Sequence, residues 1–274
     1  MKRTAFIFVF LYAAFLLDAQ SHISTQPHQE AVSVITPAAQ EADFSKAYVS
    51  AGKDGFLIKW TDDNQGEHYQ ISEYEIKAAA VSPDRRFIAV YETDGGLVNR
   101  LALWDWETLS RKWARLYKDS VTSLSFTENG TYIIAGTATV SGAEFIRTAT
   151  GDVAAGKIKD ATGIISYAVT NSTEKNAALY SPAGNLSFYD LTTGRVKQRI
   201  SVMQGLSQAV LFNNFLFLAG VKDGAVSISY CITGKPVATI KAANPLLLAS
   251  KSDRNLYYLE NDGKGLYTLK MLAN

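Results

Sequence analysis

A glycine-containing turn recurs along the chain about every 42 residues, and this repeat restricts the possible folds more than any other feature. The six turns contain Gly55, Gly95, Gly142, Gly184, Gly224 and Gly263. Successive glycines are 40, 47, 42, 40 and 39 residues apart. A unit of this length that holds four short strands is typical of a β-propeller blade, whereas sandwiches and barrels lack such a long internal period.

Strands are predicted on both sides of every turn, because short runs of Val, Ile, Leu, Tyr and Phe are separated by turn residues about every ten positions. The strands before the turns are 47–50, 87–91, 132–135, 176–180, 215–218 and 256–259. The strands after them are 56–60, 101–105, 144–147, 186–190, 226–230 and 266–270. Further inner strands are predicted at 78–82, 121–126, 164–169, 206–212 and 246–249, and outer strands at 112–116, 154–158, 196–200 and 236–240.

The repeat therefore predicts an all-β protein, a β-propeller of six blades with about four antiparallel strands each. Seven blades or an incomplete ring are the alternatives. We place the propeller at residues 46–274 and a tail at residues 20–45. Residues 31–35 of this tail are expected to supply a missing strand, and pairing with the last sheet would close the ring and remove two exposed sheet edges.

Several short motifs resemble the WD40-like propeller family over roughly residues 46–272. Trp104-Asp105 ends one third strand, and Tyr189-Asp190 ends another two blades later. The segment from Val81 to Asp84, followed by Arg86 to Ala89, is similar to the first turn of a WD40 unit. The family's Gly-His dipeptide is missing from every unit, so the buried His–Asp hydrogen-bond network that the resemblance implies is not expected here.

The first nineteen residues have the three parts of a secretory signal. Lys2 and Arg3 precede an apolar run from Thr4 to Leu17, and Ala19 offers a small residue at the cleavage position. The run of about 14 residues is shorter than the ~20 that a membrane-spanning helix needs. We therefore predict export to the periplasm or the extracellular space, with residues 1–19 removed and no integral membrane segment in the mature chain.

The chain contains three Asn-x-Ser/Thr triplets, which matter only if the protein passes through a eukaryotic secretory pathway. They begin at Asn129, Asn171 and Asn185. Such triplets accept glycans in a eukaryotic secretory pathway and have no such role elsewhere. Whether these asparagines are glycosylated is therefore left open at this point.

The charge balance argues against polyanionic partners. The chain has 27 basic and 26 acidic residues, and removal of Lys2, Arg3 and Asp18 with the signal leaves 25 of each. Proteins that bind nucleic acids or anionic membranes usually present a clustered basic surface. We therefore expect no nucleic-acid partner.

Residues for nucleophilic catalysis are scarce. His22 and His28 lie in the predicted tail, which leaves His68 as the histidine of the predicted propeller, and no Gly-x-Ser-x-Gly motif accompanies it. Cys231, the single cysteine, lies in a strand-like run and is expected to be a buried structural thiol. No catalytic residue is assigned, and we predict that the protein is not an enzyme.

Metal-ligating patterns are also lacking. Zinc sites need several His or Cys residues at close spacing. Residues 62–66 have a superficial likeness to a calcium loop but lack its alternating ligands and closing glutamate. The sequence therefore predicts no metal and no cofactor.

Loops at one end of the blades are the predicted binding surface, because a repeat places equivalent loops on one face. The candidate binding residues are Asp54, Asp94, Trp106, Trp113, Asp223 and Asp262. The competing interpretation is structural. Asp before Gly is also typical of tight hairpin turns, and tryptophan is usually packed between blades.

These observations favour an exported, non-catalytic propeller that acts as a scaffold for a protein partner. The main alternative is a propeller enzyme or small-ligand-binding protein that uses carboxylates or tyrosines at the mouth of the central channel. A third hypothesis is a propeller component of a larger envelope assembly with no ligand of its own.

Overall fold

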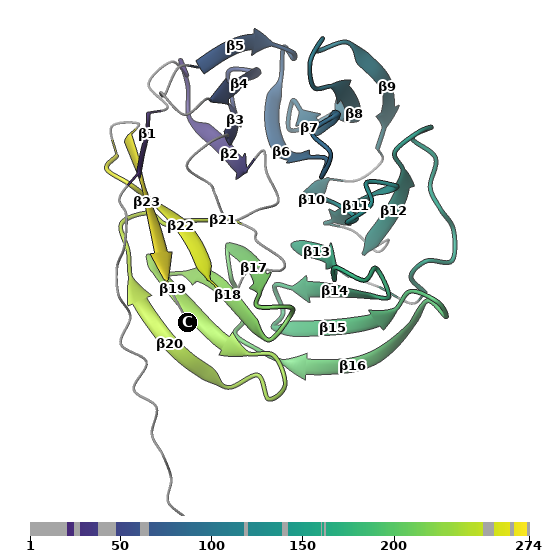
Figure 1. Ribbon diagram of the computed structural model, residues 1–274, viewed down its shortest axis with the longest axis vertical. Coiled ribbons are helices and arrows are strands. Elements are labelled where there is room, and N and C mark those ends of the chain that lie inside the picture. Colours follow the sequence, from purple (N-terminus) through teal and green to yellow (C-terminus); the bar gives the residue numbers. More distant parts are fainter. Residues whose placement is uncertain are drawn as a thin grey trace, which may run out of the picture.

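A computed structural model shows six small antiparallel sheets arranged in a ring (Figure 1), which confirms the predicted six-bladed propeller. It describes residues 21–24, 28–37, 48–60, 66–117, 120–138, 142–159, 161, 163–248, 255–263 and 266–272. These residues form 23 strands and no helix. The predicted signal, residues 1–19, lies outside the described residues.

Each blade contains strands that are consecutive in the sequence, with one exception in blade six. Blades one and two consist of β2 (Val32–Pro37), β3 (Tyr48–Gly52), β4 (Phe56–Trp60) and β5 (Gly66–Gln70), and of β6 (Glu75–Val81), β7 (Phe87–Thr93), β8 (Asn99–Asp105) and β9 (Arg111–Leu116). Blades three and four consist of β10 (Val121–Phe126), β11 (Tyr132–Thr137) and β12 (Ala143–Arg147), and of β13 (Tyr167–Thr170), β14 (Asn176–Ser181), β15 (Asn185–Asp190) and β16 (Arg195–Ser201). Blades five and six consist of β17 (Gln208–Phe212), β18 (Phe217–Lys222), β19 (Ala225–Tyr230) and β20 (Pro236–Lys241), and of β21 (Leu246–Leu248), β22 (Leu256–Asn261), β23 (Leu266–Leu272) and β1 (Ser21–Ser24).

The six marker glycines all occupy the turn between the second and third strands of a blade. Their φ angles lie between 67° and 84°, in the left-handed region that a residue with a Cβ atom rarely adopts. The 42-residue period is therefore the period of this turn. This explains why the second and third strands were predicted at the right places in every blade.

The ring is closed by residues that precede the predicted ring-closing strand. Residues Ser21–Ser24 form β1 and pair antiparallel with β23 at the outer edge of blade six. The segment predicted for this role, residues 31–35, instead lies in β2, the innermost strand of blade one, where it pairs with β3. The physical reason is that blade one also needs an inner strand, for which the prediction had assigned no segment. β2 fills this place and buries the hydrophobic side chain of Ile35.

Blade three has three strands, and the outer strand predicted at residues 154–158 is wrong. After β12 the chain makes a single bridge between Ile146 and Val153 and then turns away at Gly156, whose φ is 81°. Ile158 packs against the apolar cluster between blades three and four. The Lys159 amide donates a hydrogen bond of 2.8 Å to the Gly194 carbonyl of blade four. Residues 157–159 thus fasten blade three to its neighbour instead of extending the sheet.

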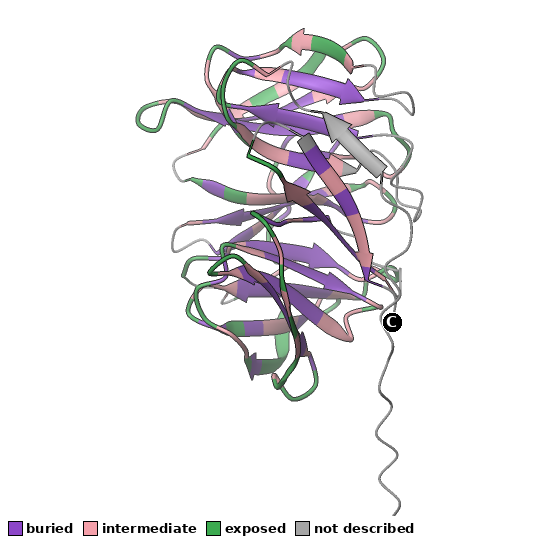
Figure 2. Ribbon diagram, turned by 90° about the vertical axis from the view of Figure 1, so that its left-hand side faces the viewer, coloured by how far each residue is buried: buried purple, intermediate pink, exposed green. Residues whose placement is uncertain are grey.

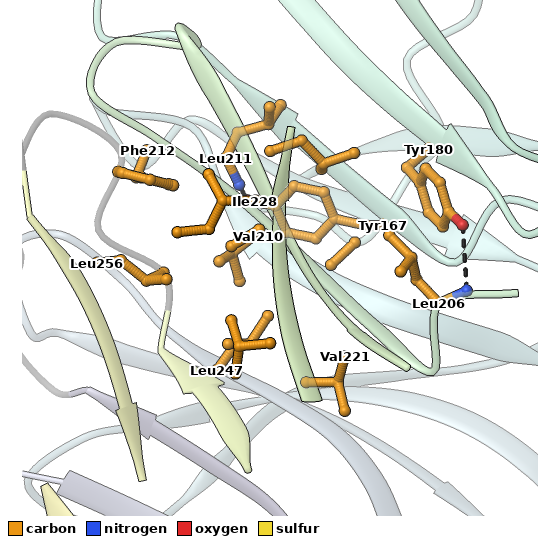
Figure 3. Close-up of a cluster of buried hydrophobic side chains, with 14 of the residues drawn as sticks. Tyr167, Tyr180, Leu206, Val210, Leu211, Phe212, Val221, Ile228, Leu247 and Leu256 are labelled. Atoms are coloured by element: carbon orange, nitrogen blue, oxygen red, sulfur yellow. Dashed lines mark hydrogen bonds between the residues drawn. The ribbon is translucent and has the colours of Figure 1, made fainter. Parts of the chain in front are cut away.

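The apolar core lies between the blades, whereas exposed residues gather in the turns and along the outer strands (Figure 2). The cluster around blades four and five contains buried tyrosines whose hydroxyls hold the backbone just before β17 and within it. Tyr180 Oη accepts a hydrogen bond of 3.2 Å from the Leu206 amide (Figure 3), and Tyr167 Oη accepts one of 3.3 Å from the Leu211 amide. Among the described residues, no helix is long and apolar enough to span a bilayer.

Candidate functional sites

The central channel is the first place to look for a ligand site. It contains a cavity of about 350 Å³, and the innermost strands of all six blades contribute to its lining. The lining side chains are mainly small hydroxyl and aliphatic groups. The polar ones come from Ser33, Thr36, Lys77, Thr122, Ser123, Ser166, Tyr167, Ser207 and Gln208.

Most polar groups of the channel already have partners within the protein. Ser33 Oγ donates a hydrogen bond of 3.0 Å to Glu75, and Lys77 Nζ lies 3.8 Å from the same carboxylate. Gln208 Oε1 accepts from the Leu247 amide at 2.8 Å. Burial raises the pKa of Tyr167 to about 12, so its hydroxyl stays protonated. Within the described lining, the channel offers hydroxyl groups and one lysine but no paired carboxylates for acid–base catalysis.

A buried polar network joins the N-terminal segment to blade one. His28 Nδ1 lies 2.9 Å from Asp54 Oδ2, and His28 Nε2 lies 2.8 Å from Ser50 Oγ. A carboxylate only accepts hydrogen bonds, so Nδ1 carries a proton and donates to Asp54, while Nε2 and the Ser50 hydroxyl share a second hydrogen bond. Asp54 also accepts from the Gln29 amide at 3.0 Å, and Ser50 Oγ accepts from Trp60 Nε1 at 2.8 Å.

The order Ser50, His28, Asp54 has the connectivity of a catalytic triad, but the environment assigns it a structural role. A triad needs a nucleophile that a substrate can reach and donors that stabilise an oxyanion. Ser50 has no solvent-exposed surface, and the side chains of His28 and Asp54 are 1% and 5% exposed. The network joins the segment at His28 and Gln29 to β3, to the turn at Asp54 and to β4.

The network corrects two expectations drawn from the sequence. His28 belongs to the folded part of the chain, and a buried His–Asp hydrogen-bond network is present in blade one. It was missed because His28 follows Pro27 rather than glycine and lies outside the 42-residue repeat. The sequence did contain a signal, because Ser50, Asp54 and Trp60 lie in one predicted blade and, once buried, require hydrogen-bond partners.

The four predicted aspartates all lie in turns between second and third strands, and because neighbouring strands are antiparallel these turns share one face of the ring. Asp54 is buried in the network described above. Asp94 is exposed, and its Oδ1 accepts from the amides of Gly96 and Val98 at 2.7 and 2.9 Å. The same amides lower the pKa of the Asp94 carboxyl. Asp223 and Asp262 are exposed on the same face but in blades five and six.

The two predicted tryptophans do not join that face. Trp106 lies in the turn between β8 and β9, on the opposite face, where Lys59 Nζ lies 4.9 Å from its ring centre. Trp113 lies on β9, and its Nε1 donates a hydrogen bond of 2.8 Å to the Thr148 carbonyl of blade three. Both side chains pack against neighbouring blades, so the structure divides the six candidates between two faces and the rim.

One exposed residue on the aspartate face was missed by sequence reasoning. Leu97 is 97% exposed at the tip of the turn between β7 and β8. Asp94 braces this turn from within, and Asn99 Oδ1 accepts from the hydroxyls of Tyr91 and Thr93 at its base. We call the face of the ring that carries this turn face A. The signal in the sequence was a leucine between two glycines and a strand, where a polar residue is usual.

A polar cavity of about 500 Å³ also opens on face A. It is lined by residues 70–74 of the connection between blades one and two and by Arg100 of β8. Arg100 Nε donates to the buried carboxylate of Glu92, which also accepts from the Ser72 hydroxyl. This arrangement holds the guanidinium at a fixed position three residues from Leu97.

Metal binding finds no support in the part of the chain that the structure describes, where no group of three or more His, Cys, Asp or Glu side chains is placed to hold an ion. Of the sequence with a superficial likeness to a calcium loop, residues 62–65 lie outside the described residues. His68 is exposed on β5. Burial raises the pKa of the Cys231 thiol to about 12, which agrees with a structural role.

Comparison with known proteins gives two matches. Residues 18–269 match a family described as an N-terminal beta-propeller domain. A protein of Treponema pallidum (strain Nichols), described as an uncharacterized protein, is 28% identical over 214 residues. The alignment covers 78% of this chain and 35% of that protein, so the chain is similar to about a third of the length of this relative.

Proposed function

The chain belongs to the family of N-terminal beta-propeller domains, and on this premise we propose that it is an exported, non-catalytic scaffold of WD40-like architecture that binds a protein partner through face A. Export rests on the signal-like residues 1–19. The WD40-like assignment rests on the Trp104-Asp105 motif and on the buried network of His28, Asp54, Ser50 and Trp60.

The exposed turn at Leu97 is the observation that carries the binding proposal. A leucine that is 97% exposed stabilises nothing within the propeller, yet five hydrogen bonds hold its turn in one conformation. Asp94 and Thr93 accept three of them from backbone amides, and the hydroxyls of Tyr91 and Thr93 donate the other two to Asn99. A rigid turn loses little conformational entropy when a partner covers it. Burial of the leucine side chain would then contribute about 1.5–3 kcal/mol to the complex.

The neighbouring cavity suits a protein partner better than a compact small ligand. Its lining is polar, with Gln70, Glu73, Tyr74 and Arg100 offering hydrogen bonds beside the apolar tip. An apolar contact next to a polar rim is the usual composition of a protein–protein interface. Enclosed ligand sites, by contrast, are lined mostly by apolar side chains with a few polar groups.

The enzyme alternative has less support. It requires reactive groups at the channel mouth, and the described lining of the channel offers hydroxyl groups and Lys77, of which Lys77 is adjacent to Glu75. The similar protein of T. pallidum is about three times as long as the aligned region. A role for the propeller as one module of a larger envelope assembly is therefore compatible with the scaffold function.

Affinity capture of the tagged full chain from its native source tests the proposal. Leu97→Asp should abolish recovery of a stoichiometric partner, whereas Leu116→Asp, at a 76% exposed leucine on β9, should leave it unchanged. N-terminal sequencing of the same material should begin at Gln20. Equal recovery with both variants would contradict binding at face A, and an intact Met1 in the cytoplasmic fraction would contradict export.

A further inference from the structure

The outer strands of the blades differ sharply in charge, and β20 is one of those that carry few charges. The outer edge of blade four, β16, carries Arg195, Lys197 and Arg199, all exposed, and β9 of blade two has the same number of basic residues. In β20 the exposed residues are Pro236, Val237, Thr239 and Lys241. Residues 237–240 therefore form an uncharged stretch at a solvent-exposed sheet edge (Figure 1).

The hydrogen-bond pattern shows which backbone groups of β20 are available. The Ala242 amide donates to the Gly224 carbonyl, so the inward-bonding positions of this hairpin are Ile240 and Ala238. The alternate positions, Thr239 and Lys241, direct their N–H and C=O groups away from β19. An exposed edge of this kind is a template for another strand unless charged residues or proline protect it.

We propose that β20 pairs antiparallel with the β20 of a second copy of this chain, forming a two-fold symmetric dimer. In the register where Thr239 lies opposite its own copy, Val237 lies opposite Lys241 of the partner. No like charges face each other in this register. Pro236 has no amide hydrogen to donate, so the pairing extends from Val237 to Lys241.

The same pairing is disfavoured for the neighbouring blade. Two copies of β16 centred on Lys197 would place that lysine opposite its own copy and Arg195 opposite Arg199, and like charges directly opposite are destabilising. Two apolar side chains add to the attraction at β20. Val237 is 58% exposed, and Ile232 in the turn before β20 is 60% exposed. The charge pattern thus permits self-association at β20 and opposes it at β16.

This dimer is independent of the partner proposed for face A, because β20 lies on the rim of blade five. Sedimentation velocity over a range of protein concentrations measures it directly. The wild-type chain should form a reversible dimer, and Thr239→Lys should weaken dimerisation about tenfold or more, because the new lysine faces its own copy. Gln198→Lys, an exposed change on β16, is the matched control and should leave the dimer unchanged.

Disulfide trapping tests the register. Cα atoms of a hydrogen-bonded antiparallel pair are about 5.5 Å apart, which is within the range that a disulfide spans. Thr239→Cys should therefore cross-link two copies under mild oxidation, whereas Gln198→Cys should not. The native Cys231 is buried and does not compete. A chain that stays monomeric at all concentrations, or a dimer that Thr239→Lys leaves intact, would overturn the proposal.

Discussion

Blades one and three solve the same packing problem with opposite chemistry. Ser50 lies in the second strand of blade one and Ile134 in that of blade three, and neither has any exposed surface. In blade one the serine joins a network that reaches the N-terminal segment through His28. In blade three the isoleucine packs into the cluster shared with blade four. A polar network appears where the ring closes, and apolar packing suffices where consecutive blades meet.

The location of the network explains the difference. Between β1 in blade six and β2 in blade one the chain crosses the closure, and His28 and Gln29 lie on this crossing. Asp54 holds both residues, through the imidazole of the first and the amide of the second. Hydrogen bonds of defined geometry specify one position for the crossing, whereas apolar contacts alone would tolerate several. The network therefore fixes the chain where the ring closes.

Among the predictions, alkaline pH should reduce the stability of the fold most. The two blades are therefore to be compared at neutral pH, well below the pH at which the chain unfolds. Burial raises the pKa of Tyr167 from 10.0 to about 12 and that of Cys231 from 9.0 to about 12. The unfolded chain ionises first, so the stability that these groups contribute is present below about pH 9 and is lost as the pH rises toward 12. Circular dichroism against pH should show the chain unfolding within this window. A fold that persists unchanged above pH 12 would contradict the burial of both groups.

His28→Ala should have the largest effect among the substitutions. It leaves the Asp54 carboxylate and the Ser50 hydroxyl buried without their shared partner, and the expected loss is about 3–4 kcal/mol in the free energy of unfolding. Urea denaturation at neutral pH measures it. His68→Ala on β5 is the matched control, because that histidine is exposed, and it should change the free energy by less than about 0.5 kcal/mol.

Ile134→Ser makes the reciprocal change in blade three. It creates a cavity and buries a hydroxyl in an apolar cluster, so the expected loss is about 3 kcal/mol. The same denaturation experiment applies. If the serine were tolerated as well as at position 50, the surroundings rather than the network would decide which chemistry each blade uses, and the comparison would fail.

Ser50→Ala sharpens the comparison with a smaller effect. The substitution removes one hydroxyl and leaves Trp60 Nε1 and His28 Nε2 without that partner, while the Asp54–His28 contact remains. The expected loss is about 1–2 kcal/mol. A loss as large as that of His28→Ala would mean that the serine, and not the imidazole, is the centre of the network.

The second and third strands of each blade were predictable because their turn demands a glycine with positive φ, and this demand recurs in every unit. The outer strand of blade three was predicted at residues 154–158 from its place in the repeat, although the Ala, Gly and Lys residues of this segment are depleted in strands, and the backbone at Gly156 turns away from the sheet. β1 has the sequence Ser-His-Ile-Ser, which carries no hydrophobic alternation to reveal it.

The candidate sites were less predictable than the fold for a related reason. The aspartates were found because the repeat marks their turns, but the repeat cannot say that Asp54 is buried by a histidine 26 residues earlier while Asp94 is exposed. Leu97 escaped notice because exposure depends on the whole ring. Trp106 was grouped with residues of the opposite face because the sequence analysis did not separate the turns between second and third strands from those between third and fourth strands.

Hydrogen exchange of His28→Ala, compared with the wild-type chain, tests most directly whether the His28 network stabilises the ring closure. If the network holds the closure, amides in β1, β2, β3 and β23 should exchange faster in the variant, while those of blades four and five keep their protection. Equal protection at the closure in both proteins, or a loss of protection spread evenly over all six blades, would contradict a specific role of the network in stabilising the ring closure.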